Sequence, residues 1–570
     1  MSKNSSPVIP FWGRISFLWL LLVPIVCAMY TLLLPIAPND FWYNVRAGSV
    51  ISQTGQIPTT ALFTTSLPAG TPYYYQSWIA QVLLFKTLQF GGLSGIILLR
   101  TICLTASFSL LVWLSWTCAR QVSARASQPL PETSLARIVA LSCLLAYSLA
   151  ASNMDVRPQT FSVLLFTVWM VLIFKWSHVT HKTRLTIAAA LVLLMALWAN
   201  THGAFFTGLV VLASFFIGEA LHFSLSRKRP QINRIFGTPP TSSSVRALGI
   251  LVALCTLAPL LNPRGAMIYF YVFKLAGLKA GQKFIQEWQS PSFNQWYGAL
   301  FFISLIGVFV LAGVLLRRAK PAEQNAPEWL RGAMGARPGE MAILVVMAIL
   351  ALRDIRSIIW FALLLAPVMA AMYTRLLLNR TRPTATEDSP PKSVQVVNAI
   401  IAMGLIFSCI PLLPAYKPGL GLPPEYTSHF APNPAGQFPL GFSSDPKLLL
   451  DRDTPVEAVE YLRKNPPRGR LWNDMVFGSY LVWAGAPQAL PHCDPRVEMY
   501  PLAFWEEYGR LIDGPPDAAR TLRAQGFSDA LLHVKDEKPL IVRLQKSGWR
   551  ALLKKGNAIL LRDANNTVDN

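Results

Sequence analysis

The sequence predicts a polytopic α-helical membrane protein of about eleven transmembrane helices that ends in a small extracytoplasmic α/β domain. Three observations lead to this prediction. The 570 residues are 53% hydrophobic and only 14% charged. Apolar runs of roughly 17–25 residues, long enough to cross a bilayer, recur through the first part of the chain. Positive charge gathers in alternate loops between these runs.

The expected membrane spans are defined by these apolar runs and lie at 14–36, 93–116, 137–152, 159–175, 184–199, 203–222, 246–262, 298–316, 341–353, 356–374 and 396–414. The first run is too long for the apolar core of a signal peptide and lacks a small-residue cleavage site, so we expect a retained anchor. The 7 cysteines show neither a disulfide framework nor metal-ligand spacing.

The distribution of basic residues predicts the orientation. Loops on the side of the N-terminus hold about 22 Lys and Arg against about 9 in the other loops, which places the N-terminus in the cytoplasm. An odd number of spans then places the C-terminal domain outside. The formal net charge of +22 lies in the cytoplasmic loops rather than in the terminal region, so nucleic acid is not an expected partner. The predicted location is the bacterial inner (plasma) membrane.

Composition divides the chain into a transmembrane region (1–415), a Pro- and Gly-rich linker (416–445) and the α/β domain (446–570). The domain should have strands near 478–483, 530–534 and 558–561, and helices near 455–464, 501–511 and 515–525. The long first outward loop, 37–92, is expected to form interfacial helices at 40–52 and 78–90. Trp42 and Tyr43 would anchor the first of these at the level of the lipid headgroups.

Four acidic residues are the only carboxylates predicted on the outward side of the membrane region: Asp40, Asp155, Glu287 and Asp354. An ionisable group at the membrane boundary of a helix bundle is costly to keep there, and it therefore indicates a functional site. Since all four fall on one predicted face, we expect a single reaction centre.

Other polar groups are predicted on the same face, and they suggest a lipid-linked phosphate as substrate. Arginine binds phosphate through a planar fork that stays charged. A carboxylate can take a proton from an acceptor or hold a divalent metal ion, Mg²⁺ or Mn²⁺, against the leaving phosphate. The metal candidates are Asp40, Asp155 and Glu287. The substrate-binding candidates are Arg157, Arg353, Arg356, His202, Asn200 and Gln76.

Each candidate also has a purely structural interpretation. Asp40 could cap the helix that follows it, Asp155 could pair with Arg157, and Asp354 could pair with its arginine neighbours. His202 could satisfy backbone carbonyls in its turn. Glu287 could pair with Lys283 at helical spacing.

The order of short motifs resembles the GT-C superfamily of membrane glycosyltransferases, in particular a bacterial branch without an assigned activity. The motifs are Asp40-Phe41-Trp42, Arg157-Pro158-Gln159, Asn200-Thr201-His202-Gly203, Glu287-Trp288-Gln289-Ser290-Pro291, and, in the terminal domain, Trp472-Asn473, Gly478-Ser479-Tyr480-Leu481-Val482-Trp483, Asp494-Pro495-Arg496 and Tyr500. Two positions depart from the pattern, which often has a His at the place of Asn44 and His-Glu at the place of Gln76-Ser77.

The resemblance implies an inverting transfer of a hexose or pentose from a polyprenyl-phosphate donor to an extracytoplasmic acceptor. Asp40 would be the catalytic group, with Asp155 and Glu287 completing the acidic site. Asp494 and Arg496, with Glu498, would meet the acceptor or pack over the membrane site, or else form a buried salt bridge that orders a loop. Two other functions remain open: a transporter or flippase for lipid-linked glycans, and a non-catalytic membrane protein of envelope assembly. The implied partners are a lipid-linked sugar donor and membrane lipids; the sequence identifies neither the sugar nor the acceptor.

Overall fold

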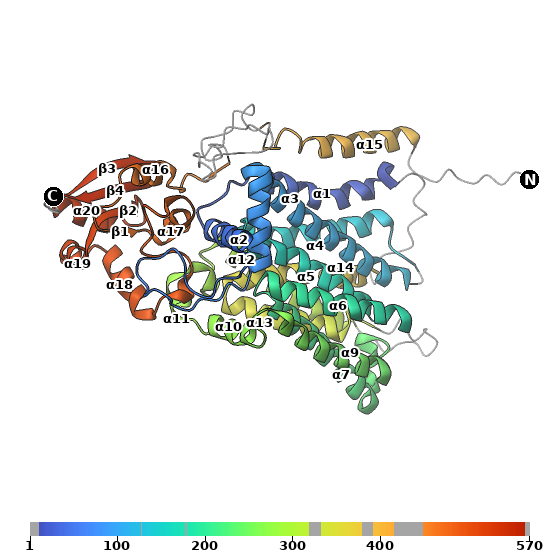
Figure 1. The fold of residues 1–570 in the computed structure, drawn as a ribbon. Coiled ribbons are helices and arrows are strands. Elements are labelled where there is room, and N and C mark those ends of the chain that lie inside the picture. The colour runs from blue at the N-terminus through green and yellow to red at the C-terminus, as the bar shows by residue number, and fades with distance from the viewer. Residues whose placement is uncertain are drawn as a thin grey trace, which may run out of the picture.

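The computed structural model describes residues 11–126, 128–176, 179–318, 332–378, 391–414, 416 and 449–564. Figure 1 shows a bundle of long helices with the C-terminal domain at one end of it and the start of α1 at the other. The end of the bundle next to the C-terminal domain is called the domain end. It comprises residues 34–92, 151–158, 202–204, 258–295 and 354–357. The predicted fold class, a polytopic helical protein with a small α/β domain, is confirmed for the described residues.

Nine helical segments in the described part of the chain are long and apolar enough to cross a membrane. They are Ile15–Leu33 (α1), Trp78–Ala124 (α3), Glu132–Asn153 (α4 with a 3₁₀ turn), Pro158–Trp176 (α5), Lys182–Thr201 (within α6, His181–Thr201), Phe205–Lys228 (α7), Ser242–Leu261 (α9, Ser242–Leu257, with a 3₁₀ turn), Trp296–Arg317 (α12) and Ile355–Leu378 (a 3₁₀ turn with α14, Ile358–Leu378). The last of these is central, because 83% of its apolar window is buried inside the protein.

The other two predicted spans are shorter helices, so nine of the roughly eleven expected crossings are helices of full spanning length in the described part of the chain. Pro338–Arg353 (α13) and Lys392–Phe407 (α15) have 16 residues each. That is a length of about 24 Å, whereas the hydrocarbon layer is about 30 Å thick. α13 nevertheless runs from one end of the bundle to the other. Arg337 at its start binds Glu219 of α7, and the carbonyl of Arg353 at its end accepts from Ser290 at the domain end.

The first long loop forms two helices that lie across the domain end, as predicted. Phe41–Thr54 (α2) packs on the first part of α3, which bends at Gly92, where φ is +59°. Gly48 allows the close approach of these two helices, because a Cβ there would stand 2.0 Å from the carbonyl oxygen of Gln81. The predicted headgroup anchor is wrong for Trp42, which is 1% exposed and packs against Tyr480 and Trp483 of the terminal domain.

Shorter helices complete the membrane region and the terminal domain. They are Asn233–Phe236 (α8), Met267–Ala276 (α10), Lys279–Phe284 (α11), Val456–Lys464 (α16), Met475–Tyr480 (α17), Leu502–Ile512 (α18), Ala518–Ala524 (α19) and Lys538–Lys546 (α20). α10 and α11 lie between the bundle and the terminal domain, where Lys283 of α11 reaches Glu506 of α18.

The terminal domain contains a four-stranded mixed sheet in the order β1-β2-β4-β3. Its strands are Arg470–Asn473 (β1), Phe527–His533 (β2), Trp549–Lys555 (β3) and Ala558–Asp563 (β4). β1 and β2 are parallel, and the other pairs are antiparallel. The predicted helices near 455–464, 501–511 and 515–525 and the predicted strands near 530–534 and 558–561 all occur at these places. Most of the predicted linker lies outside the described residues.

The predicted strand at 478–483 is wrong, because this segment is helical from Met475 to Gly485. Asp474 begins the helix by accepting hydrogen bonds from the amides of Val476 and Phe477. Residues 477–485 are buried throughout. A short helix buried on every side shows no polar face, and its apolar run cannot be distinguished from a buried strand by periodicity.

Candidate active site at the domain end of the bundle

Asp40 is positioned by a short turn that is held on both sides. Before it, the buried Arg100 of α3 donates hydrogen bonds to the carbonyls of Thr31, Leu34 and Pro35, which the end of α1 would otherwise leave unpaired. After it, the Asn44 amide donates to the carbonyl of Asp40 at 2.7 Å. Arg100, the main charge within a predicted span, therefore has a structural role in placing Asp40.

Asp40 differs from the other carboxylates around it because its side chain accepts no hydrogen bond from any described residue, including those of the helix it precedes. The capping interpretation is therefore not supported. Burial raises the pKa of Asp40 to about 6, and Arg157 and Arg356 counteract part of that increase. The side chain is partly exposed. A carboxylate that is desolvated, unpaired and accessible can accept a proton from a bound hydroxyl near neutral pH.

Arg157 and Glu287 form a bidentate ion pair close to Asp40. The two hydrogen bonds from the guanidinium of Arg157 to Glu287 measure 2.9 and 3.0 Å. Burial alone would raise the pKa of Glu287, but Arg157 and Arg356 outweigh burial and hold this pKa below its usual range. Glu287 is thus ionised and paired across the chain. The alternative pair with Lys283 does not form, since Lys283 reaches Glu506 instead.

Asp155 and Asp354 are each bound by a neighbouring polar group. The Asn39 amide donates to Asp155 at 3.1 Å, which links this carboxylate to the turn that carries Asp40. Asp354 accepts hydrogen bonds of 2.9 and 2.6 Å from the amide and hydroxyl of Ser357. Neither residue forms the arginine ion pair considered for it. Burial raises the pKa of both carboxyl groups, with partial opposition from the Arg157 charge at Asp155 and from hydrogen bonds to Ser357 at Asp354.

Arg356 is the arginine best placed to receive an anion. Its Nε donates to Gln159 at 3.3 Å, which orients the side chain, and its guanidinium lies 5.9 Å from the centre of the Trp288 ring. The two terminal nitrogens have no hydrogen-bond partner among the described residues. Arg353, by contrast, is exposed and donates to the carbonyl of Ala276. Arg356 thus leaves two donors available, and both belong to one planar group.

His202 ends α6 and is held in one tautomer. Its Nδ1 accepts from the amide of Ala204 at 3.3 Å and lies 3.0 Å from the hydroxyl of Ser162. Burial, aided by Arg356 and Arg157, lowers the pKa of His202 well below its ordinary value, so the ring is neutral. With Nδ1 acting as an acceptor, the proton is on Nε2. His202 can therefore offer one N–H donor to a ligand.

Asn200 and Gln76 are engaged within the protein. The side-chain oxygen of Asn200 accepts from Trp78 at 2.8 Å and from Asn262 at 3.1 Å, while its amide donates to Ala196. Gln76 is buried and donates to the carbonyl of Ala199 at 3.4 Å. These contacts fasten the first loop to the end of α6.

Asp494 and Arg496 form a buried ion pair, with side chains that are 0% and 2% exposed. Arg496 donates to Asp494 at 2.9 and 2.7 Å and to the carbonyl of Leu62 at 2.9 Å. The pair therefore joins the terminal domain to the first loop, and its oxygens and nitrogens face protein groups. This arrangement corresponds to the structural alternative that the sequence left open.

The sequence analysis did not predict the contacts of a group of residues from three distant segments. Glu498 accepts hydrogen bonds from Tyr73 at 3.0 Å and from Tyr271 of α10 at 3.1 Å, and its charge helps to raise the pKa of Asp40. Arg496 lies 5.4 Å from the ring centres of both Tyr43 and Tyr73. One signal was available, because Glu498 closely follows the conspicuous Asp494-Pro495-Arg496 motif.

The predicted metal ligands do not form a metal site. Among the described residues, no three His, Cys, Asp or Glu side chains come together in a way that could hold an ion. Both oxygens of Glu287 are occupied by Arg157. Asp40, Asp155 and Glu287 in this arrangement therefore do not provide a ligand set for Mg²⁺ or Mn²⁺.

No protein-family model matches the sequence, and no curated protein is similar to it in sequence. Among solved structures, the chain is similar to arabinofuranosyltransferase AftD from Mycobacteria, with 13% identity and a TM-score of 0.44, over 96% of this chain but only 40% of AftD. It is also similar to ArnT from Cupriavidus metallidurans in the apo state, with 12% identity and a TM-score of 0.45, over 96% of this chain and 97% of ArnT. At these identities and scores, neither likeness assigns this chain an activity or a substrate.

Proposed function

We propose that this protein is a membrane glycosyltransferase that moves a sugar from a polyprenyl-phosphate donor to an extracytoplasmic acceptor. One observation carries the proposal. Among the four carboxylates of the domain end (Asp40, Asp155, Glu287 and Asp354) and Glu498 of the terminal domain, Asp40 alone has no hydrogen-bond donor among the described residues. It is the one left free to act on a substrate.

In the proposed reaction, Asp40 takes the proton from the acceptor hydroxyl as that oxygen forms a bond to the anomeric carbon. The bond from this carbon to the phosphate oxygen breaks, and the phosphate leaves with the electron pair as polyprenyl phosphate. Attack opposite the leaving group inverts the anomeric centre. The proton remains on Asp40, and a pKa of about 6 suits a group that must both accept and release it near neutral pH.

The leaving phosphate would be bound by Arg356, whose terminal nitrogens are available, and by the Nε2–H of His202. Arg157 is a positioning residue in this mechanism, because both of its terminal nitrogens are engaged with Glu287 and Asn153. Its positive charge, together with that of Arg356, still favours an anion nearby. Arg353 is exposed and would meet the headgroup region. The site lies at the membrane boundary, where an isoprenoid chain can stay among the helices.

The terminal domain would form the acceptor side of the site. Glu498 lies close enough to influence Asp40, and the rings of Tyr43 and Tyr73 each lie 5.4 Å from the guanidinium of Arg496. Aromatic faces with nearby polar groups are suited to sugar rings, which have both apolar faces and hydroxyl edges. The predicted bacterial inner membrane and the outward position of this domain belong to the same proposal.

Transport is the less supported alternative. A transporter would be expected to keep charged groups near the membrane midplane for its substrate. The main candidate for such a group, Arg100, is buried and spends its terminal nitrogens on three carbonyls at the end of α1. A non-catalytic role in envelope assembly would not explain why a partly buried carboxylate, Asp40, accepts no hydrogen bond from the described residues.

The test is donor turnover by the purified full chain in lipid nanodiscs. A panel of radiolabelled polyprenyl-phosphate hexoses and pentoses is supplied with a mixed extract of envelope acceptors, and release of polyprenyl phosphate is measured. Asp40→Asn should lower turnover by about 10²–10⁴-fold, the usual contribution of general base catalysis. Glu506→Gln, which changes an exposed acid outside the site, should turn over donor at the wild-type rate.

Lower turnover by Asp40→Asn could also result from unfolding, and a measurement of thermal stability on the same samples tests this. The ionised form of Asp40 is disfavoured by burial, so the neutral Asn should leave thermal stability at pH 7 unchanged or increased. Equal donor turnover by wild type and Asp40→Asn defeats the catalytic role. Absence of turnover by the wild type on every donor in the panel defeats the proposed activity.

A further inference from the structure

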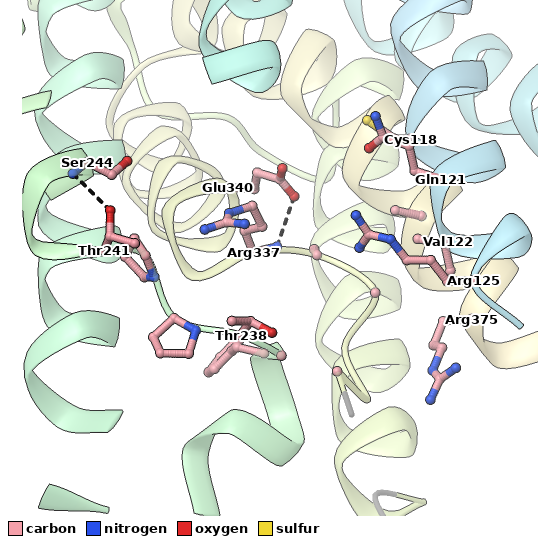
Figure 2. Close-up of a pocket in the computed structure, with 18 of the residues that line it drawn as sticks. Cys118, Gln121, Val122, Arg125, Thr238, Thr241, Ser244, Arg337, Glu340 and Arg375 are labelled. Carbon is pink, nitrogen blue, oxygen red and sulfur yellow. Dashed lines mark hydrogen bonds between the residues drawn. The ribbon is translucent and has the colours of Figure 1, made fainter. Parts of the chain in front are cut away.

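A polar hollow lies at the end of the bundle opposite to Asp40. It is a cavity of about 400 Å³ (Figure 2). Its walls come from the last turns of α3, the first turns of α6, the segment before α9, the segment before α13 and the last turns of α14. The continuous segment Ile355–Leu378, which contains α14, carries Arg356 at the candidate active site and Arg375 at this cavity. These two residues are about 28 Å apart along a helix, so the two sites are distinct.

The walls of the cavity carry an excess of positive charge. Glu340 is the acidic residue among the lining side chains. The four arginines that line the cavity are Arg125, Arg184, Arg337 and Arg375. One carboxylate oxygen of Glu340 is already engaged, because it accepts a hydrogen bond from the backbone N–H of Arg337 at 3.0 Å. The guanidinium of Arg337 is bound to Glu219 of α7 behind it. Arg125 and Arg184 therefore form no ion pair with an acidic side chain of this cavity.

Arg125 and Arg184 each have guanidinium N–H donors without a hydrogen-bond partner among the described residues. Arg125 has no hydrogen-bond or ion-pair partner within the described ranges, and Figure 2 shows it reaching from the end of α3 toward the segment of Arg337 and Glu340. Arg184 donates through Nε to the carbonyl of Trp176 at 3.2 Å, which leaves its terminal nitrogens without a partner among these residues. Charges of one sign held around an enclosed space favour an ion of the opposite sign.

The backbone around the cavity adds to this preference. α9 begins at its rim, where Thr241 and Ser244 present hydroxyl groups, whereas the first turn of α13 on the facing wall already binds Glu219 through the amide of Gly339. The first turn of a helix attracts anions through its free N–H groups and its dipole. Gly335, at φ +76°, brings the chain so close to α14 that a Cβ there would stand 2.9 Å from the carbonyl oxygen of Ala371.

We propose that this cavity binds a phosphate-bearing anion, either the headgroup of an anionic phospholipid or a soluble phosphate ester. Arginine forks match the oxygens of phosphate in geometry and charge. The cavity volume falls within the roughly 300–1,000 Å³ of small-molecule sites. The loops around it hold the basic excess that predicts the cytoplasmic side, so the ligand would come from the cytoplasm or the inner leaflet. The proposal does not depend on the glycosyltransferase activity.

The test measures binding to the purified full chain. Thermal unfolding is followed in detergent during titrations of inorganic phosphate and of glycerol 3-phosphate, with sodium chloride at matched ionic strength as reference. Native mass spectrometry of the protein from nanodiscs of phosphatidylcholine with one-fifth phosphatidic acid reports bound anionic lipid. The variants are Arg125→Gln, Arg125→Lys and Arg125→Gln combined with Arg184→Gln. Arg227→Gln is the control, because it removes an exposed arginine that does not line the cavity.

A rise in melting temperature with either phosphate compound beyond that with chloride, retained in Arg227→Gln, supports a soluble ligand. Retained phosphatidic acid without a phosphate effect supports a lipid headgroup. In both cases, affinity should fall roughly tenfold for each glutamine substitution, since a charged hydrogen bond is lost. The affinity of Arg125→Lys, which keeps the charge, should fall less than that of Arg125→Gln. If the double variant does not fold, this comparison of the two single variants tests the proposal. Wild-type protein that shows neither effect, or glutamine variants that bind as well as wild type, overturns the proposal.

Discussion

The carboxylates at the domain end have the same functional group but differ in their hydrogen-bond partners in the folded protein. Glu287 is neutralised by a bidentate arginine, Asp155 is tied to Asn39, and Asp354 holds Ser357. Asp40 has the same functional group without a partner. A carboxylate in this state is costly for folding, and it is retained at a place where an acceptor and a phosphate could meet.

The raised pKa of Asp40 predicts how the proposed activity depends on pH. The base form is lost as pH falls through about 6, so kcat/KM should decrease about tenfold per pH unit well below 6 and level off above about 7. The measurement is donor turnover between pH 4.5 and 8.5 at subsaturating donor. Glu506→Gln should keep the same acidic limb. A flat profile from pH 5 to 7 with full activity contradicts the assignment of Asp40 as base.

At the level of elements, the position of Asp40 depends on how two helices of the first loop pack. α2 begins directly after Asp40, and its Gly48 lies against the backbone of α3 at Gln81. Asn44 joins the two helices, since it accepts from Gln81 at 2.9 Å and donates to the carbonyl of Asp40. Asn at the place where the resembling pattern often has His therefore acts as a connector in this chain.

A methyl group at Gly48 should separate these helices. Gly48→Ala would place its Cβ 2.0 Å from the carbonyl oxygen of Gln81, and overpacking of this kind typically costs about 1–3 kcal/mol. We expect a lower melting temperature and, through the displaced Asp40, slower donor turnover. Gly91→Ala is the matched control in the same region, because its Cβ would meet nothing within 4 Å. Equal behaviour of the two variants in both measurements would show that the close contact is unimportant.

For the whole molecule, the terminal domain is fastened to the bundle through the first loop. Ile36 forms a backbone hydrogen bond with Leu449, and the buried Arg496 holds the carbonyl of Leu62. The aromatic contacts of Trp42 with Tyr480 and Trp483 extend the same interface. This attachment brings Glu498 over the region of Asp40, so the candidate site requires both parts of the protein.

Breaking the buried ion pair should loosen this attachment. Asp494→Asn leaves Arg496 buried without its charge partner, which commonly costs about 3–5 kcal/mol. We expect faster cleavage of the first loop near residues 56–72 in limited proteolysis. Glu506→Gln disrupts the exposed pair with Lys283, in which the side chains are 51% and 60% exposed, and should cleave at the wild-type rate. Unchanged cleavage in Asp494→Asn would argue against the pair as a fastener.

Local patterns predicted much of this protein. Apolar runs predicted the positions of the long helices, and aromatic and polar spacing predicted the helices at 40–52 and 78–90. The sharp change of direction at Gly92 fits the boundary expected between the interfacial and membrane parts of α3. The helix at 475–485 was mistaken for a strand because it is buried on every side, and Trp42 was mistaken for a lipid anchor because its covering comes from residues more than 400 positions away.

The sequence by itself determined which residues could form a reaction centre and on which face they would lie, because hydrophobicity and charge are properties of each segment. Only the tertiary structure decided how those residues divide their roles. Arg157 selects Glu287 over Asp155, Arg496 is sealed against Asp494, and Glu498 reaches its tyrosines across distant segments. The physical reason is that pairing and desolvation depend on distances between segments, and such distances exist only once the chain has packed.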